Sequence, residues 1–293
     1  MGDSLLPSPR AAGSPLVFTM TRTRFAAPLP PLNSARILRK YGLRANKSLG
    51  QNFLQDGYDL EKIAAAAEIL PTDTVLEVGP GLGALTRHLA VAAKQVVAVE
   101  LDERLLLPLK EVVAGYTNIT IIHGDILKLA PAEIVPAADY LVVANIPYNI
   151  TSALLRHLLE TTPRPRRLVL TIQKEVADRI CAAPGDMSLL ALSVQVYGQP
   201  RIAAIIPAEA FYPAPKVDSA VVRIDLSPTP FIPTSLLDTF FMLARAGFSQ
   251  KRKTLRNSLS AGMRKTPAEM ETMLRTAGID PKRRAETLSL EEW

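Results

Sequence analysis

Two acidic residues, Glu100 and Asp125, each stand at or just after the end of a short β-branched segment. Ligands of open α/β sheets bind at the carboxyl ends of the strands, so acids at these positions can reach one common ligand. Glu100 can accept hydrogen bonds from both hydroxyls of a ribose, and Asp125 can accept one from the amino group of an adenine. Glu100 could instead be a helix N-cap, but Asp102 suits that role better because a helical pattern follows it directly. Asp125 could equally be an ordinary turn residue.

A glycine-rich turn precedes both acids, with Gly79, Gly81 and Gly83 following the apolar segment 74–78. Glycine permits backbone conformations and a close approach of ligands that a Cβ would prevent. The spacing G-x-G-x-G differs from the G-x-G-x-x-G of dinucleotide folds, which disfavours a nicotinamide dehydrogenase. Pro80 also removes an N–H group that a phosphate cradle would use. The turn therefore favours a ligand with a carboxylate and a ribose, although an ordinary strand-to-helix turn remains the alternative.

Residues 145–148, with the sequence Asn-Ile-Pro-Tyr, follow a fourth apolar segment and carry the sharpest chemical signal. An adenine N6 amine is a poor nucleophile because its lone pair is delocalised into the ring. Two acceptors aimed at its N–H groups, the side-chain oxygen of Asn145 and the carbonyl of Ile146, would free that lone pair. Tyr148 offers a face on which an everted base can stack. The alternative is an ordinary Asn-x-Pro turn.

Strand and helix patterns alternate strictly from residue 74 onward, and this alternation positions the acids and the Asn-Ile-Pro-Tyr segment. Strands are expected at 74–78, 95–99, 119–123, 140–144 and 167–172, and helices at 83–93, 103–113, 151–159 and from Lys174 onward. Such alternation predicts βαβ units, right-handed crossovers and a parallel sheet. Segments 201–206 and 220–226 predict two late strands joined by a proline-rich loop. The expected fold class is α/β, a doubly wound, mostly parallel sheet with an antiparallel edge strand.

Composition divides the chain into three regions. Residues 1–33 are rich in Pro, Arg, Ser and Ala, which predicts a disordered N-terminal tail because such a segment cannot bury a core. Residues 34–228 form the expected catalytic domain. Residues 229–293 are expected to form a small all-helical C-terminal domain, with helices at 235–246, 251–260 and 267–277 and a further helix starting at Pro281.

The overall composition restricts the class of protein. The formal charge of +6 and the pI of about 9.5 favour a polyanionic partner. No apolar run is long enough to span a membrane. The single cysteine, Cys181, and three scattered histidines offer neither a disulfide framework nor a metal site. We therefore expect a cytoplasmic protein with no membrane partner and no metal.

Taken in order, these motifs closely resemble those of the KsgA/RsmA family, the ribosomal RNA small-subunit adenine N6,N6-dimethyltransferases. The resemblance covers about residues 34–289. It rests on segments 47–54 (KSLGQNFL), 77–86 (EVGPGLGALT), 99–102 (VELD), 124–125 (GD), 145–148 (NIPY), 211–217 (FYPAPKV), 278–280 (GID) and 284–288 (RAETL). It implies a Rossmann-like class I methyltransferase that uses S-adenosyl-L-methionine.

The resemblance also implies roles for individual residues. The cofactor-binding positions it implies are Asn52, Leu54, Gly79, Glu100, Asp125 and Asn145. Catalytic roles fall on Asn145, which holds the target amine, and on Tyr148 and Phe211, which would sandwich the target base. The basic run 245–256 in the C-terminal domain is expected to contact RNA phosphates, unless it is only a solvated helix face.

The function implied is transfer of methyl groups to N6 of two adjacent adenosines in a hairpin loop near the 3′ end of 16S rRNA, giving N6,N6-dimethyladenosines during ribosome biogenesis. The expected partner is the small-subunit rRNA or a pre-30S particle, bound by a monomer. One alternative is the related large-subunit rRNA adenine methyltransferases of the macrolide-resistance type. Another is a non-catalytic RNA-binding assembly factor on the same fold.

Overall fold

The computed structural model describes residues 29–293. Most of the predicted tail, residues 1–28, lies outside the described residues. The remainder of that tail departs from the prediction, because it packs on the domain that follows. The Pro30 carbonyl accepts a hydrogen bond from the Arg87 guanidinium at 2.9 Å, and the Asn33 side chain caps the first helix by accepting from the Arg36 N–H at 2.9 Å. Residues 30–33 are therefore joined to the part of the chain that begins at residue 34.

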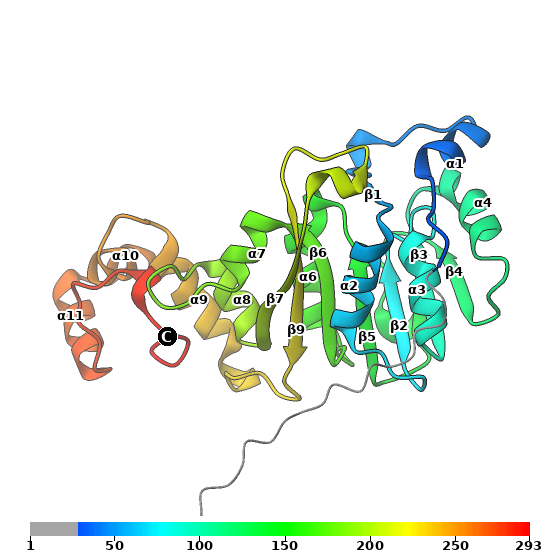
Figure 1. The fold of residues 1–293 in the computed structure, drawn as a ribbon. Helices are drawn as coiled ribbons and strands as arrows, with labels where there is room; N and C mark the ends of the chain where they lie inside the picture. The colour runs from blue at the N-terminus through cyan, green and yellow to red at the C-terminus, as the bar shows by residue number, and fades with distance from the viewer. Residues whose placement is uncertain (1–28) are drawn as a thin grey trace, which may run out of the picture.

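A seven-stranded sheet forms the centre of the molecule (Figure 1). Its strands are β2 (Thr74–Val78), β3 (Gln95–Glu100), β4 (Ile119–His123), β5 (Tyr140–Asn145), β6 (Arg167–Gln173), β7 (Gly198–Ile206) and β9 (Ser219–Leu226), in the order β4-β3-β2-β5-β6-β9-β7. The first five are parallel, whereas β9 runs antiparallel to β6 and to β7. The predicted mostly parallel sheet with an antiparallel pairing at one edge is confirmed.

Helices cover both faces of the sheet, because the central strands are apolar on both sides (Figure 1). The helices are α1 (Ser34–Lys40), α2 (Gly57–Ala67), α3 (Ala84–Ala92), α4 (Glu103–Val112), α5 (Pro131–Ile134), α6 (Thr151–Glu160), α7 (Lys174–Ile180) and α8 (Leu189–Gln195). Helices α2 and α3 share one buried cluster with strand residues such as Val75 and Val143. Helices α6, α7 and α8 share the cluster on the other face.

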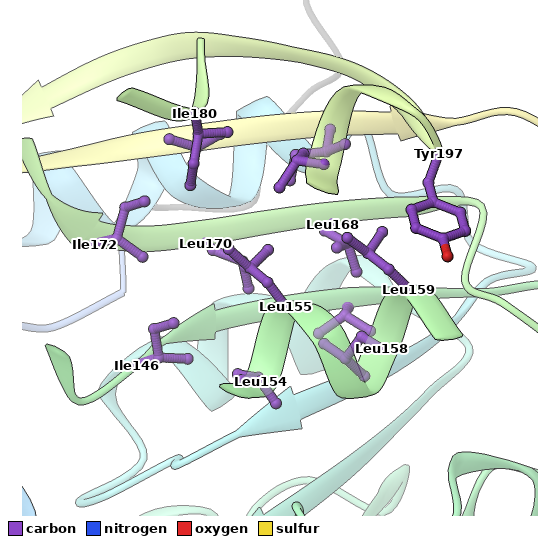
Figure 2. Close-up of a cluster of buried hydrophobic side chains, with 14 of the residues drawn as sticks. Ile146, Leu154, Leu155, Leu158, Leu159, Leu168, Leu170, Ile172, Ile180 and Tyr197 are labelled. Atoms are coloured by element: carbon purple, nitrogen blue, oxygen red, sulfur yellow. The ribbon is translucent and has the colours of Figure 1, made fainter. Parts of the chain in front are cut away.

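The cluster on the α6 face holds the end of β5 in place. Leu154 and Leu158 of α6 are fully buried against Leu168 and Leu170 of β6, and Ile146 reaches into the same cluster from the end of β5 (Figure 2). Each buried leucine contributes about 1.5 to 3 kcal/mol of hydrophobic stabilisation. Anchoring of the Ile146 side chain in this core fixes the backbone of the turn that follows β5.

The strand order reverses direction between β2 and β5, so their connections leave on opposite sides and create a crevice at their carboxyl ends. A separate two-stranded sheet, β1 (Phe53–Leu54) paired antiparallel with β8 (Phe211–Tyr212), lies at this end of the domain (Figure 1). The topology therefore brings the glycine turn, both acids and the Asn-Ile-Pro-Tyr segment to one edge of the sheet.

The C-terminal region is helical, as expected, with α9 (Leu237–Phe248), α10 (Leu255–Met263) and α11 (Pro267–Thr276) around a small cluster of their own. Two predictions here were wrong. Helix α10 begins at Leu255 rather than at residue 251, because the basic residues before it form a turn. No helix starts at Pro281; a short 3₁₀ turn, Ala285–Thr287, follows instead.

Helix α9 joins the two parts of the chain, since Phe240 and Ala244 belong to the core of the catalytic domain while Ala246 belongs to the C-terminal cluster. Within residues 29–293, no helix is both long and apolar enough to cross a lipid bilayer.

Candidate active site

A cavity opens at the carboxyl ends of β2, β3, β4 and β5, with an empty volume of about 1170 Å³ that includes the solvent at its mouth. Seven of the eight predicted site residues line it: Asn52, Leu54, Gly79, Glu100, Asp125, Asn145 and Tyr148. The eighth, Phe211, does not. Residues far apart in the sequence thus meet in one crevice, as the strand pattern predicted.

The glycine turn forms one wall of this cavity, and its backbone requires glycine. Gly79, Gly81 and Gly83 have φ angles of 68°, 58° and 86°, in the left-handed region that side chains disfavour. A Cβ on Gly81 would also meet the Phe53 ring at 3.0 Å. The turn therefore presents bare backbone to the cavity, which suits close contact with a ligand.

Glu100 lies beside this turn and is only 5% exposed. Its two carboxylate oxygens accept hydrogen bonds from the Gly81 N–H at 2.9 Å and the Asp102 N–H at 2.8 Å. Burial raises the pKa of Glu100, and these backbone donors work against that rise. Each oxygen keeps a lone pair, so the carboxylate is held ready to accept from a pair of ligand hydroxyls.

Asp102 is the N-cap of α4, as predicted, and accepts from the Arg104 N–H at 3.2 Å. The same carboxylate accepts from the Gln51 side-chain amide at 2.8 Å, and the Gln51 oxygen accepts from the Asn46 N–H at 2.8 Å. Gln51 thereby ties the loop before β1 to the short connection between Glu100 and α4. Gln51 was not among the predicted site residues, because no local pattern reveals a contact between segments so distant in the chain.

Asp125 stabilises a turn and also lines the cavity, where it was predicted to accept from an adenine amino group. One carboxylate oxygen accepts from the Leu127 N–H at 3.1 Å, which is the turn-stabilising bond of an ordinary turn aspartate. The other oxygen lies 3.7 Å from the Lys128 ammonium, which is largely exposed. The carboxylate lines the cavity with one oxygen only weakly engaged, so it can still accept from an amino group.

Asn145 ends β5 with its amide fixed, because the NH₂ group donates to the Asn52 carbonyl at 3.2 Å. Within residues 29–293, no group donates to the Asn145 side-chain oxygen, so this oxygen can accept from a ligand in the cavity. Among the described residues, no loop N–H donates to the Ile146 carbonyl. Two acceptors therefore stand next to each other at the end of β5.

The Tyr148 ring follows this turn and is held by a hydrogen bond of 2.8 Å between its hydroxyl and that of Ser219. Burial raises the pKa of the Tyr148 hydroxyl, so it stays protonated at neutral pH. The hydroxyl therefore positions the ring and is poorly suited to act as a base. A fixed aromatic ring beside two acceptors can hold a flat base with its amine directed at them.

Comparison with known proteins identifies the family. Residues 42–293 match the family described as "Ribosomal RNA adenine dimethylase". This chain belongs to that family. Ribosomal RNA adenine dimethylases use S-adenosyl-L-methionine, and the family membership confirms the expectation drawn from the sequence motifs.

Relatives of this dimethylase support the assignment. The chain is 50% identical over 269 residues to "Ribosomal RNA small subunit methyltransferase A" of Dehalococcoides mccartyi (strain CBDB1), which covers 92% of each chain. It is 41% identical over 273 residues to the protein of the same name from Bacillus pumilus (strain SAFR-032), covering 90% of this chain and 94% of the relative.

Solved structures similar to this dimethylase share its fold. A dimethyladenosine transferase from Plasmodium falciparum has a TM-score of 0.71 at 28% identity, over 82% of this chain and 94% of that one. The 23S rRNA methyltransferase ErmE has a TM-score of 0.69 at 31% identity, over 83% of this chain and 96% of that one. The predicted Rossmann-like class I methyltransferase fold is thus confirmed.

The cavity of this dimethylase fits S-adenosyl-L-methionine. A buried carboxylate with spare acceptor capacity at Glu100 suits a ribose, and bare backbone at Gly79 and Gly81 suits the close approach of an amino acid group. Among residues 29–293, no group of three or more His, Cys, Asp or Glu side chains is arranged to hold a metal ion. The binding roles of the individual residues remain predictions.

Phe211 of the dimethylase is not among the residues that line this cavity. Its ring is 3% exposed and packs in the buried cluster with Leu54, its partner across the β1–β8 pairing. The prediction treated Phe211 as a cavity residue because the motif resembles the family's, whereas strand alternation turns it into the core. Stacking on the target base would require Phe211 to leave this packing.

Glu77, near the end of β2, is a buried acid beneath the dimethylase cavity, and its raised pKa can be tested through the pH dependence of stability. Burial raises the pKa of Glu77 to about 8, and one of its oxygens has no hydrogen-bond partner among the described residues. Between an unfolded pKa of about 4.5 and this folded value, the unfolded chain loses the proton that the folded chain keeps, so stability falls as pH rises.

We therefore expect Glu77→Gln to flatten the pH dependence of the free energy of unfolding between pH 5 and pH 8. The wild type should lose up to about 1.4 kcal/mol per pH unit relative to the variant over this range. Urea unfolding of both proteins at several pH values measures the difference. Parallel curves for the two proteins would show that Glu77 ionises normally.

Proposed function

We propose that this dimethylase methylates N6 of two adjacent adenosines in a hairpin loop near the 3′ end of small-subunit rRNA, giving N6,N6-dimethyladenosines. Its curated relatives carry the name of small-subunit methyltransferases, which supports the choice of subunit. The observation that carries the chemistry is the pair of free acceptors at Asn145 and Ile146 beside the Tyr148 ring. We further propose that it acts as a cytoplasmic monomer on a pre-30S particle and needs no metal.

In the proposed mechanism, bound S-adenosyl-L-methionine supplies a methyl group activated by its positive sulfonium. Glu100 accepts from the ribose, Asp125 accepts from the cofactor's adenine amine, and Asn52, Leu54 and Gly79 line the side of the cavity that takes the methionine end. These contacts hold the cofactor in one orientation, and orientation contributes a large part of the rate enhancement of a two-substrate reaction.

The target amine is activated by acceptors and not by a strong base. The Asn145 oxygen and the Ile146 carbonyl accept from its two N–H groups, which draws the nitrogen toward a tetrahedral shape and exposes its lone pair. Tyr148 stacks on the everted base and so holds the target amine level with these acceptors. Because the amine becomes acidic once it is methylated, its proton can leave to water. Fixed acceptors of this kind cost no reorganisation during the reaction.

Exposed basic residues around the cavity and on the C-terminal domain suit the RNA backbone. Residues 251–253 (Lys-Arg-Lys) are all exposed in the turn between α9 and α10, and Arg44 and Lys47 are exposed near the cavity. We propose that both groups contact phosphates, which orients the RNA without reading its sequence. The turn geometry of residues 251–253 favours this role over a solvated helix face, since these side chains do not belong to a helix.

The large-subunit alternative has one observation in its favour, the similarity to the 23S rRNA methyltransferase ErmE. Incubation of the protein with labelled S-adenosyl-L-methionine and isolated, under-methylated small or large subunits distinguishes the two. We expect label in the small subunit alone, at two adjacent adenosines mapped by primer extension. Label confined to the large subunit would replace the proposal with the alternative.

A further inference from the structure

The β1–β8 pairing sorts the two aromatic residues of β8 onto opposite faces. Leu54 lies opposite Phe211, and Phe53 lies opposite Tyr212. Directly opposed residues of an antiparallel pair point to the same face. The face of Leu54 and Phe211 is buried in the core. The Tyr212 side chain is therefore on the face of Phe53.

Phe53 and Leu54 both line the cavity, and Phe53 does so on the side of the glycine turn. The Phe53 ring lies so close above the glycine turn that a Cβ on Gly81 would meet it at 3.0 Å. Tyr212 continues the face of Phe53 outward and is 40% exposed, whereas Phe53 is 8% exposed. The Tyr212 hydroxyl makes no hydrogen bond with any residue between 29 and 293, so its ring is available to a partner.

The loop that begins at Tyr212 ends at a residue that contacts the cavity wall. Its far end, Ser219, holds the Tyr148 ring through the hydroxyl pair of 2.8 Å. Between these two ends, Lys216 and Val217 are exposed, and Lys216 forms no salt bridge within the described part of the chain. The loop thus exposes an aromatic ring and a cation between two points next to the cavity, the Phe53–Tyr212 pair at one end and the Ser219–Tyr148 contact at the other.

From this arrangement we infer that Tyr212 is a second stacking platform, which holds the purine adjacent to the target adenosine while the target occupies the cavity. Lys216 contacts a backbone phosphate of the same dinucleotide. The inference rests on the proposed function, in which two adjacent adenosines are substrates. One base can enter the cavity at a time, so its neighbour stays at the rim, where a flat purine stacks well on an exposed ring.

Tyr212 is in this account a positioning residue, and its aromatic ring carries the effect. We expect Tyr212→Ala to raise the KM for under-methylated small subunits about ten-fold, with a smaller change in kcat, because aromatic stacking of an unpaired base contributes binding on that scale. Tyr212→Phe should keep a KM close to that of the wild type. The affinity for S-adenosylhomocysteine, measured by calorimetry, should be the same in all three proteins.

A matched control is Phe231→Ala, which removes an aromatic ring that is 53% exposed and follows the C-terminal end of β9, whereas the Tyr212 loop enters β9 at its N-terminal end. It should leave the KM unchanged, and thermal unfolding of each variant shows whether it is folded. A wild-type KM for Tyr212→Ala, or an equal loss for Tyr212→Phe, would overturn the inference.

Fluorescence quenching tests the stacking without turnover. An RNA hairpin carries 2-aminopurine beside a loop adenosine, and stacking on Tyr212 should quench its emission in the wild type and in Tyr212→Phe but not in Tyr212→Ala. If the wild type methylates no small subunits, the proposed function fails, yet this quenching still decides whether Tyr212 stacks. Equal quenching in Tyr212→Ala would refute the stacking even if the enzyme is active.

Discussion

Asn145→Ala is expected to reduce kcat for methyl transfer to under-methylated small subunits by at least about 10²- to 10³-fold, the range for loss of one preorganised polar group from an active site. The variant loses the side-chain oxygen that accepts from the target amine, and it releases the Asn52 carbonyl that the amide group holds at 3.2 Å. Binding of S-adenosylhomocysteine should remain measurable by calorimetry, because Glu100 and the glycine turn are untouched.

Asn145→Asp supplies the matched comparison for this prediction. It keeps an acceptor oxygen but places a carboxylate against the Asn52 carbonyl, so we expect activity between those of the wild type and the alanine variant. Wild-type turnover by Asn145→Ala would show that Asn145 does not take part in methyl transfer. The Ile146 carbonyl would then be the only proposed acceptor for the target amine.

Glu100→Ala should weaken the binding of S-adenosylhomocysteine by at least about ten- to a hundred-fold, because hydrogen bonds to a charged acceptor contribute about 1.5 to 3 kcal/mol each. The loss has two sources. The ribose loses its acceptor, and the Gly81 and Asp102 N–H groups lose the carboxylate that shapes both loops. Titration calorimetry gives the change in Kd directly.

The control for Glu100→Ala is Glu103→Ala, since Glu103 is an exposed acid at the start of α4 and forms no salt bridge with residues 29–293. Glu103→Ala should bind S-adenosylhomocysteine with the same Kd as the wild type. An unchanged Kd in Glu100→Ala would contradict the ribose role, whereas a fall in kcat alone would move Glu100 from binding to the methyl-transfer step.

The parallel sheet was predictable because its strands are β-branched runs bounded by clear breaks. Strands β2 and β4 have the predicted limits, and β5 differs by a single residue. Buried parallel strands are apolar on both faces, so the pattern is strong and local. The helical C-terminal region was less predictable: the chain beyond Pro281 packs through short turns, which leave no periodic pattern in the sequence.

The assignment of Asp102, and not Glu100, as the N-cap of α4 was also predictable, because an N-cap has a fixed place before a helix. What could not be predicted depends on contacts between distant segments. The bond from Gln51 to Asp102 and the pairing of β1 with β8 are of this kind. The pairing in turn places Phe211 in the core beside Leu54 and Tyr212 on the opposite face beside Phe53, which a motif alone cannot reveal.

A crystal structure of the protein with S-adenosyl-L-methionine tests the central claim most directly. We expect the ribose hydroxyls within hydrogen-bonding distance of Glu100, the methionine end above Gly79, and the sulfonium methyl directed toward the space between Asn145 and Tyr148. A cofactor bound away from Gly79 and Asn145, or with its methyl group turned from the end of β5, would contradict it.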